Sequence, residues 1–183
     1  MISLKKAEIP GVYIVFPSIF QDKRGSVVKY FQKSVANMNL LNMNFSESII
    51  STNKDKGTFR GFHFQKPPYA QSKLCVCLSG GWYNYLLDIR LGSPTYGRCI
   101  QILMDEEINQ AIYIPEGIAN GQFVLKDNTR VLYYLTNEYN RDSEGGILWD
   151  SVTMDLPEKP KIISEKDMNY LQFEDFQSPF MYV

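Results

Sequence analysis

The chain has 183 residues, 44% of them hydrophobic, and its 19 Lys and Arg residues balance 20 Asp and Glu residues, for a net charge of −1. We therefore expect one domain, residues 1–183, with a full core, and no general attraction to nucleic acid or to an anionic membrane. A single histidine, His63, excludes metal centres built from two or three imidazoles. The N-terminal residues are charged and reach Pro10 before any long apolar run, which predicts no signal peptide, no membrane span and a cytoplasmic protein.

Segments rich in β-branched and aromatic residues follow one another along the chain, separated by turn residues. We predict strands over 11–16, 26–31, 46–52, 58–65, 73–79, 82–89, 98–104, 111–114, 118–125 and 129–135. Ser79-Gly80-Gly81 predicts a tight hairpin, because glycines supply the positive φ that such turns need. So many short strands predict an all-β fold of two packed sheets or a closed barrel, and we favour a jelly roll.

Helical patterns are short. Residues 34–41 are long enough for two turns, and Ser164-Glu165-Lys166-Asp167 is typical of a turn capped by a serine. From Leu148 on, the chain is a charged tail interrupted by prolines, which we expect to pack on the barrel with short helical turns. Cys75 and Cys77 lie two residues apart in an apolar strand. This spacing indicates small core residues on one face rather than a disulfide or a zinc pair.

His63 is the main candidate for proton transfer, since histidine titrates near neutrality, although an isolated histidine is more often structural. It stands in the segment Thr58-Phe59-Arg60-Gly61-Phe62-His63-Phe64-Gln65. Strict strand alternation would place Arg60 and His63 on opposite faces. Both can serve one ligand if a bulge near Gly61 brings them together, or if Arg60 contacts a part of the ligand at the rim.

Further polar side chains interrupt the apolar strands, and their number indicates a lined pocket, although outward positions of half-buried strands are polar by default. They are Lys73, Asn84, Asp88, Asn120 and Gln122. One residue of the pair Tyr133 and Tyr134 must also point inward. A tyrosine opposite a histidine across a pocket is a suitable proton donor, because its high pKa keeps it protonated.

Seven motifs together resemble the dTDP-4-dehydrorhamnose 3,5-epimerase family in order and spacing, over nearly the whole chain. They are Asp22-x-Arg24-Gly25, Gly57-x-x-Arg60-Gly61-x-His63-x-Gln65, Ala70-Gln71-x-Lys73-Leu74, Asp88-Ile89-Arg90-x-Gly92-Ser93-Pro94-Thr95-x-Gly97, Ile114-Pro115-Glu116-Gly117-x-Ala119, Tyr133-x5-Tyr139-Asn140 and Ser164-x-Lys166-Asp167. The resemblance implies a cupin-like jelly roll, a homodimer with strands exchanged or shared at the interface, and catalysis without a metal or an organic cofactor.

The resemblance also implies an epimerase that inverts C3, C5 or both in a nucleotide-diphosphate-linked 4-keto-6-deoxy sugar, because the ketone makes the hydrogens on its neighbouring carbons acidic. In this reading His63 is the base, oriented by Asp167, and Tyr133 is the acid. Lys73, together with Arg60, stabilises the enolate oxygen or the nearby phosphate. The positions implied in substrate binding are Phe20, Arg24, Lys29, Ser48, Arg60, Lys73, Asn120, Tyr139, Glu144 and Lys166.

The chain departs from the family pattern at several positions. Ala119-Asn120-Gly121-Gln122 stands where the family commonly has Ala-His-Gly-Phe, and Ser48-Ile49-Ile50 stands where it has Gln-x-Asn. Lys29 replaces a Glu, and Asn84 replaces an Asp. The proton-transfer pair is retained while recognition positions change, which predicts an altered nucleotide, an altered sugar or inversion at one carbon only. Our hypothesis allows a dTDP-linked or a GDP-linked substrate, with a hexose or a heptose.

Two other functions fit the same residues. A sugar-nucleotide 3,4-ketoisomerase shares this barrel and its histidine base, but moves the carbonyl group. A non-catalytic sugar-binding jelly roll is favoured if His63 is buried away from Tyr133.

Overall fold

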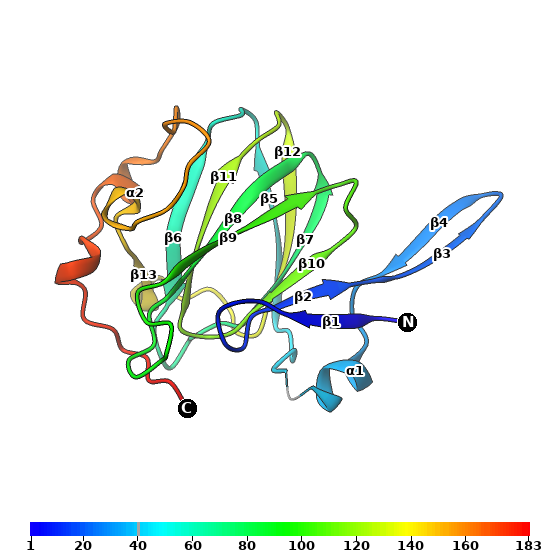
Figure 1. Ribbon diagram of the computed structural model, residues 1–183, viewed down its shortest axis with the longest axis horizontal. Helices are drawn as coiled ribbons and strands as arrows, with labels where there is room; N and C mark the ends of the chain where they lie inside the picture. The colour runs from blue at the N-terminus through cyan, green and yellow to red at the C-terminus, as the bar shows by residue number, and fades with distance from the viewer. Residues whose placement is uncertain (40) are drawn as a thin grey trace.

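The computed structural model describes residues 1–39 and 41–183, and the body of the protein is built around two facing β-sheets (Figure 1). The six-stranded sheet has the order β1 (Ser3–Lys6), β2 (Tyr13–Phe16), β10 (Ala111–Ile114), β7 (Lys73–Ser79), β12 (Thr129–Leu135) and β5 (Glu47–Asn53). The five-stranded sheet has the order β13 (Glu144–Gly146), β6 (Phe59–Gln65), β11 (Ile118–Val124), β8 (Gly81–Asp88) and β9 (Cys99–Asp105). All pairings within the two sheets are antiparallel. The prediction of an all-β fold of two packed sheets is confirmed.

The main core lies between the sheets and comes from their inward-facing alternate residues. Trp82 and Leu86 of β8 and Ile118 of β11 meet Cys75 and Ile112 of the opposite sheet. The cysteines act as small apolar side chains, because Cys75 and Cys77 are both buried in this cluster and unpaired.

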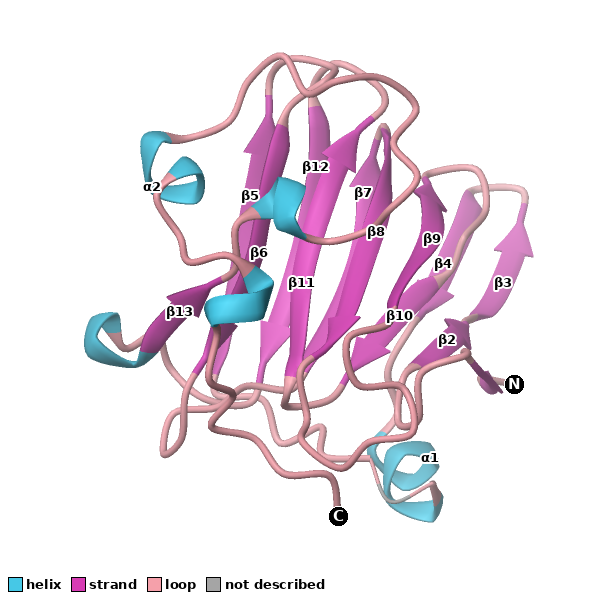
Figure 2. Cartoon of the chain, turned by 60° about the vertical axis from the view of Figure 1, so that its left-hand side comes forward, coloured by secondary structure: helices cyan, strands magenta, loops and turns pink. Residues whose placement is uncertain are grey.

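The outer faces of both sheets are also covered. A second apolar cluster joins Phe62, Phe64 and Phe123 of the five-stranded sheet to Trp149 and Phe176 of the C-terminal tail. The tail crosses in front of this sheet (Figure 2) and contains η2 (Trp149–Ser151), α2 (Glu165–Met168) and η3 (Phe173–Asp175). The turn η1 (Arg141–Ser143) comes before the tail and leads into β13. The expected packing of the tail on the barrel is therefore confirmed.

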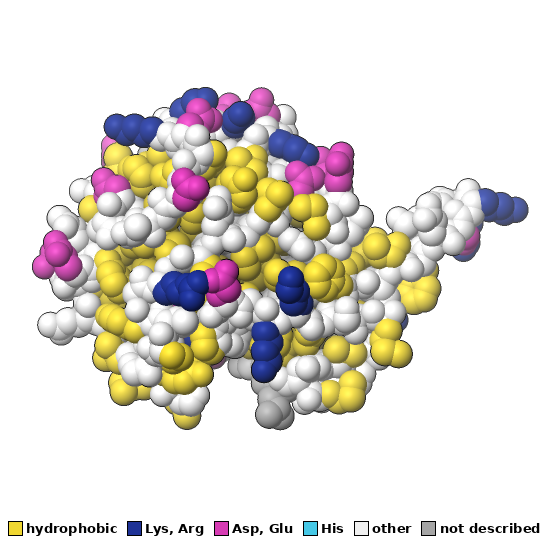
Figure 3. Space-filling model, in the orientation of Figure 1, with side chains coloured by type: hydrophobic (Ala, Val, Ile, Leu, Met, Phe, Trp, Pro, Cys, Tyr) yellow, Lys and Arg dark blue, Asp and Glu magenta, His cyan; other side chains and the backbone are white. Residues whose placement is uncertain are grey.

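A two-stranded hairpin, β3 (Ser18–Asp22) and β4 (Gly25–Lys29), projects from the body (Figure 1). Charged side chains sit at its tip (Figure 3), where Arg24 pairs with Asp22. The helix α1 (Lys33–Met38) follows the hairpin and is shorter than the predicted 34–41; residue 40 of that prediction lies outside the described residues. None of the helices in the described chain is long and apolar enough to cross a membrane.

The prediction of a hairpin at Ser79-Gly80-Gly81 is wrong. The strands on either side of this segment, β7 and β8, belong to different sheets, so Gly80 turns the chain at a corner of the sandwich. The glycine is still required there: its φ is +79°, and a Cβ would lie 2.3 Å from Oγ1 of Thr129. The signal for a turn was correct, but a glycine pair does not tell whether the following strand pairs with the preceding one.

Candidate active site

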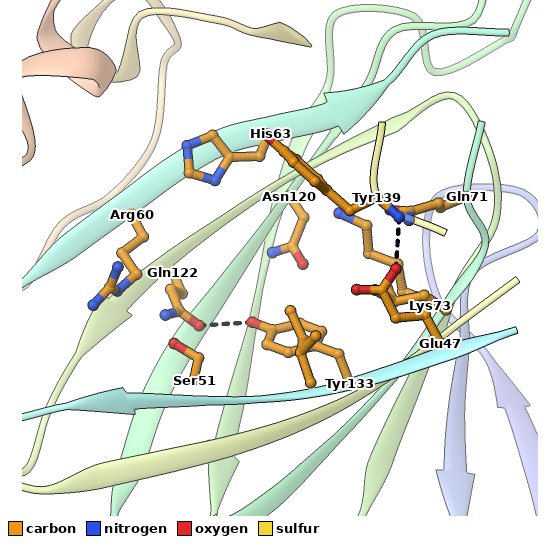
Figure 4. A pocket seen from close by; sticks show the side chains of 12 residues that line it. Glu47, Ser51, Arg60, His63, Gln71, Lys73, Asn120, Gln122, Tyr133 and Tyr139 are labelled. Atoms are coloured by element: carbon orange, nitrogen blue, oxygen red, sulfur yellow. Dashed lines mark hydrogen bonds between the residues drawn. The ribbon is translucent and has the colours of Figure 1, made fainter. Parts of the chain in front are cut away.

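A cavity of about 490 Å³ opens between the two sheets, where polar side chains replace the apolar core. It is lined by Glu47, Ile49, Ser51, Arg60, His63, Gln71, Lys73, Asn120, Gln122, Tyr133, Leu135 and Tyr139. Figure 4 shows His63 and Tyr133 on opposite walls, with Asn120 between them. The expected lined pocket is therefore present, and the conditions for the non-catalytic reading, His63 away from Tyr133, are not met.

A bulge in β6 brings Arg60 and His63 to the same cavity. Across β11, Asn120 pairs with His63 but Gln122 pairs with Arg60, so three steps along β6 face two along β11. At Gly61, between them, φ is +124°, and a Cβ would lie 2.6 Å from the carbonyl oxygen of Asn120 and from Cα of Gly121. The bulge near Gly61, one of the two conditions under which both side chains can serve one ligand, is present, and only glycine fits its backbone.

His63 is held by a buried carboxylate from the tail. Its Nε2 lies 2.7 Å from Oδ1 of Asp167, whose Oδ2 accepts a hydrogen bond from the amide N–H of Gly61 at 3.1 Å. Asp167 is 2% exposed; burial alone would raise its pKa, but the hydrogen bonds from His63 and Gly61 outweigh burial and lower the pKa. An ionised carboxylate can only accept, so in the neutral form of the ring Nε2 carries the hydrogen and Nδ1 of His63 has a free lone pair.

Asp167 reaches this place through the predicted capped turn, which is confirmed as α2. The hydroxyl of Ser164, at the N-cap, accepts a hydrogen bond from the amide of Asp167 at 3.1 Å. On the other side, the ring of Tyr170 lies edge-on to the imidazole, with centroids 5.9 Å apart. The imidazole is therefore fixed by a hydrogen bond and by packing.

Tyr133 is the inward-pointing member of its pair, while Tyr134 packs on the outer face of the sheet against Phe45. The Tyr133 hydroxyl donates to Oε1 of Gln122 at 2.8 Å. Burial raises the pKa of Tyr133 well above its usual value. The phenol therefore stays protonated and is available as an acid.

Lys73 contributes a cation to the same cavity from β7. Burial lowers the pKa of its ammonium group, and none of the ion pairs in the described part of the chain involves it. A cation with no carboxylate partner is suited to stabilise negative charge that develops on a ligand.

The back wall carries a pair of amides. Asn120 donates from Nδ2 to Oδ1 of Asn84 at 2.7 Å, and both side chains are buried. Because its nitrogen is used inward, Asn120 turns its oxygen, an acceptor, toward the remaining space. Asn84 thus supports the wall from behind. Asp88, in contrast, does not line the cavity: it is bonded to Arg90, Ser93 and Thr95 in a buried structural network.

Three more of the residues predicted to bind substrate, Tyr139, Glu144 and Lys166, lie together at the rim of the cavity. The hydroxyl of Tyr139 donates to Glu144 at 3.0 Å, and Lys166 forms an ion pair with the same carboxylate. Tyr139 itself is exposed at the mouth, where its backbone N–H donates to Glu47 at 2.6 Å. An exposed aromatic ring beside fixed charges is suited to stack on a flat ligand.

Four predicted substrate-binding residues lie away from this cavity. Ser48 is exposed on β5, on the face opposite to Glu47 and Ile49, as strand alternation requires. Phe20, Arg24 and Lys29 lie on the projecting hairpin, with the Lys29 ammonium 5.8 Å from the centre of the Phe20 ring. The structure of one chain does not bring these four side chains to His63, and their roles stay predictions.

Sequence reasoning also missed cavity residues. Glu47, Ser51 and Gln71 line the cavity but stand on an edge strand and in a loop, where polar residues are the norm. No group of three or more His, Cys, Asp or Glu side chains arranged to hold a metal ion was found among the described residues.

Comparison with known proteins gives consistent results. The model of the family described as dTDP-4-dehydrorhamnose 3,5-epimerase matches residues 6–175. The chain is 35% identical over 178 residues to the dTDP-4-dehydrorhamnose 3,5-epimerase of Shigella flexneri, covering 93% of this chain and 95% of that protein.

Solved structures agree in fold. The chain is similar to an epimerase from Legionella pneumophila crystallised with dTDP-4-keto-L-rhamnose, with a TM-score of 0.92, 28% identity and complete coverage of both chains. It is also similar to a 3'-monoepimerase from Streptomyces bikiniensis in complex with dTDP-quinovose, with a TM-score of 0.84 and 26% identity, covering 92% of this chain and 86% of that one.

Proposed function

This chain belongs to the dTDP-4-dehydrorhamnose 3,5-epimerase family, and on that premise we propose that it inverts C3, C5 or both in a nucleotide-diphosphate-linked 4-keto-6-deoxy sugar. The cupin-like jelly roll supplies the cavity. The observation that carries the proposal is the placement of His63, bonded to Asp167, opposite Tyr133 across one cavity. A base and an acid on opposite sides of a sugar ring are what inversion at a carbon requires.

His63 starts the reaction. The C4 ketone of the sugar makes the hydrogens on C3 and C5 acidic, and the free lone pair on Nδ1 of His63 accepts one of these protons. The electron pair of the broken C–H bond moves toward the ketone oxygen, which gives an enolate. Asp167 stabilises the imidazolium that forms and keeps the ring in the productive orientation.

Lys73 stabilises the enolate. Its ammonium group lines the cavity with no competing carboxylate among the described ion pairs, so the charge of the enolate oxygen can be met directly. In a cavity with little water this attraction is stronger than in bulk solvent.

Tyr133 completes the inversion by giving its phenolic proton to the same carbon from the opposite face. The C=C electron pair of the enolate forms the new C–H bond, the C=O bond re-forms, and the carbon again has four substituents in the reverse configuration, while Tyr133 becomes a phenolate. Transfer of the His63 proton to solvent and uptake of one by Tyr133 restore the enzyme. No electron is gained or lost overall.

The nucleotide part of the substrate is expected at the rim, near Arg60 and Tyr139. A guanidinium group matches the oxygens of a diphosphate, and the exposed ring of Tyr139 offers a surface for the base. We propose dTDP as the nucleotide, because the Legionella and Streptomyces relatives bind dTDP-sugars. The alternative, a GDP-linked substrate, is tested in the same assay.

The projecting hairpin supports a homodimer. Its strands β3 and β4 pair only with each other in the described chain, and β5 ends the six-stranded sheet with one open edge. Phe20 on this hairpin is 57% exposed, and Ile49 on β5 is also exposed. Pairing of one protomer's hairpin with the partner's β5 would cover both edges and would bring Phe20 and Arg24 near the partner's cavity. Sedimentation analysis that finds only monomers would refute this arrangement.

The function is tested by incubation with dTDP- and GDP-linked 4-keto-6-deoxy sugars in deuterated water, followed by NMR of the product. We expect deuterium at C3, C5 or both, together with inverted configuration, and the labelled carbon identifies the reaction. A product in which the carbonyl has moved would indicate a ketoisomerase instead. The His63→Asn variant is the matched inactive control, and any label that it introduces is background exchange. Absence of both label and product with every substrate for the wild-type protein would refute the proposed function.

A further inference from the structure

The proton donor Tyr133 depends on a neighbour that the family pattern does not contain. We infer that Gln122 is a positioning residue, which holds the hydroxyl of Tyr133 in place for the second proton transfer. This inference rests on the proposed function, because it assigns Gln122 a role in the step that Tyr133 performs.

Gln122 is unusual as a polar side chain on a central strand. It is 3% exposed, yet it lines the cavity, and its Oε1 accepts the hydrogen bond from Tyr133 at 2.8 Å. Burying a carboxamide costs free energy unless its hydrogen-bonding groups have partners. Here both ends of the carboxamide have one.

The orientation of this carboxamide is fixed by two further residues. Nε2 of Gln122 donates to Oδ1 of Asn53 at 3.4 Å, and Nε of Arg60 donates to the same oxygen at 2.6 Å. That oxygen can only accept, so Gln122 must turn its nitrogen toward Asn53 and its oxygen toward Tyr133. Every bond in the series from Arg60 to Tyr133 then has one donor and one acceptor.

The series also joins the two sheets. Asn53 and Tyr133 come from β5 and β12 of the six-stranded sheet, while Arg60 and Gln122 come from β6 and β11 of the five-stranded sheet. The hydroxyl of Tyr133 is therefore connected, through Gln122 and Asn53, to Arg60 on β6, the strand that also carries His63. This matters because the base and the acid must act on one carbon from opposite sides.

Tyr133 needs such a tether because its ring projects into a cavity large enough for a sugar. Proton transfer to carbon is sensitive to position, and a displacement of about 1 Å can cost about 10²-fold in rate. The family pattern commonly has Phe at position 122, which cannot accept a hydrogen bond. The tether is thus a feature of this chain.

The test separates the two proton transfers. In deuterated water, label that enters a carbon with retention reports His63 alone, whereas inversion also requires Tyr133. We expect Gln122→Met to slow inversion by about 3- to 10-fold, the effect of one neutral hydrogen bond, and to leave exchange within twofold. Gln122→Phe, which places the family's residue at this position, should give the same change and guards against misfolding of a single variant. Melting curves check both proteins.

Two controls make the result specific. In the Tyr133→Phe background, Gln122→Met should not lower the residual inversion any further, because the hydroxyl that Gln122 holds is already absent. Ser51→Ala also removes a polar group from the cavity wall, but Ser51 has no hydrogen bond to Tyr133. This variant should leave the ratio of inversion to exchange unchanged.

The inference is overturned if Gln122→Met lowers exchange and inversion equally, or if it lowers the residual inversion of the Tyr133→Phe variant by the same factor as in wild type. If the wild-type protein inverts its substrate and both Gln122 variants have the same ratio of inversion to exchange as wild type, only the role of Gln122 is refuted. A wild-type protein with neither exchange nor inversion removes the proposed function and this role together.

Discussion

Replacement of Asp167 by Asn tests whether this carboxylate fixes the tautomer of His63, the proposed base. The carboxylate serves two donors, the imidazole of His63 and the amide N–H of Gly61. Asn has only one oxygen for them, so one donor must face the amide nitrogen. If the oxygen stays with Gly61, the nitrogen faces Nε2 of His63 and the ring must move its hydrogen to Nδ1. The lone pair that should take the sugar proton is then lost.

The expected size follows from the bond that is lost. A hydrogen bond to a charged group contributes about 1.5–3 kcal/mol, which corresponds to about 10- to 150-fold in rate at 1.36 kcal/mol per tenfold. We therefore expect Asp167→Asn to lower kcat for deuterium exchange by about this factor, with little change in KM. Because His63 is the only histidine in the chain, its ring nitrogens can be observed by NMR without assignment, and the spectrum should show the change of tautomer.

Stability gives a second measurement of the same change. The pKa of Asp167 in the folded protein lies below its ordinary value of 3.8. The ionised carboxylate therefore contributes its full stabilisation of the fold above pH 3.8, and this contribution is lost as the pH falls through the folded-state pKa. The difference in melting temperature between wild type and Asp167→Asn should therefore be largest near neutrality and shrink in acid. Asp88→Asn is the matched control, because Asp88 is a buried carboxylate outside the cavity. It should lower the melting temperature without lowering kcat. Exchange by Asp167→Asn within twofold of wild type would show that the carboxylate does not prepare the base.

Three further changes have distinct expected results. Tyr133→Phe should abolish inversion by about 10²–10⁴-fold while deuterium exchange continues, and equal loss of both would contradict its role as the acid. Lys73→Met should slow exchange but raise the melting temperature, since burial lowers the pKa of this ammonium and thus opposes its charge; a less stable variant would refute this reading. Gly61→Ala should destabilise the protein by about 1–3 kcal/mol, because its Cβ would meet backbone atoms at 2.6 Å, and a denaturation midpoint equal to that of wild type would disprove the need for glycine.

Much of the fold follows from local pattern. Strands 73–79, 111–114 and 129–135 are predicted to the residue, since apolar and β-branched runs there end at clear turn residues. The short strands β1, β3 and β13 were missed. The first and the last of these carry few β-formers, and their pairing depends on neighbours that sequence pattern does not reveal.

The candidate site was predictable where residue chemistry is distinctive and unpredictable where partners are remote. The lone histidine indicated a site, a bulge near Gly61 was one of two ways to bring Arg60 to it, and the capped turn at Ser164 was visible in the sequence. The bond between Tyr133 and Gln122 was not, because periodicity gives the face of a strand but not which side chains meet across two sheets. The family resemblance supplied the link between His63 and Asp167, which no local rule gives.

The two members of the dyad are 104 residues apart in sequence. The barrel contributes the imidazole, while the carboxylate arrives on a four-residue helix near the end of the chain. A molecule whose sheets have formed but whose last segment is still undocked would thus have a shaped cavity and an unprepared base. Catalytic competence therefore requires the docked C-terminal segment, and turnover reports on its attachment rather than on formation of the sandwich alone.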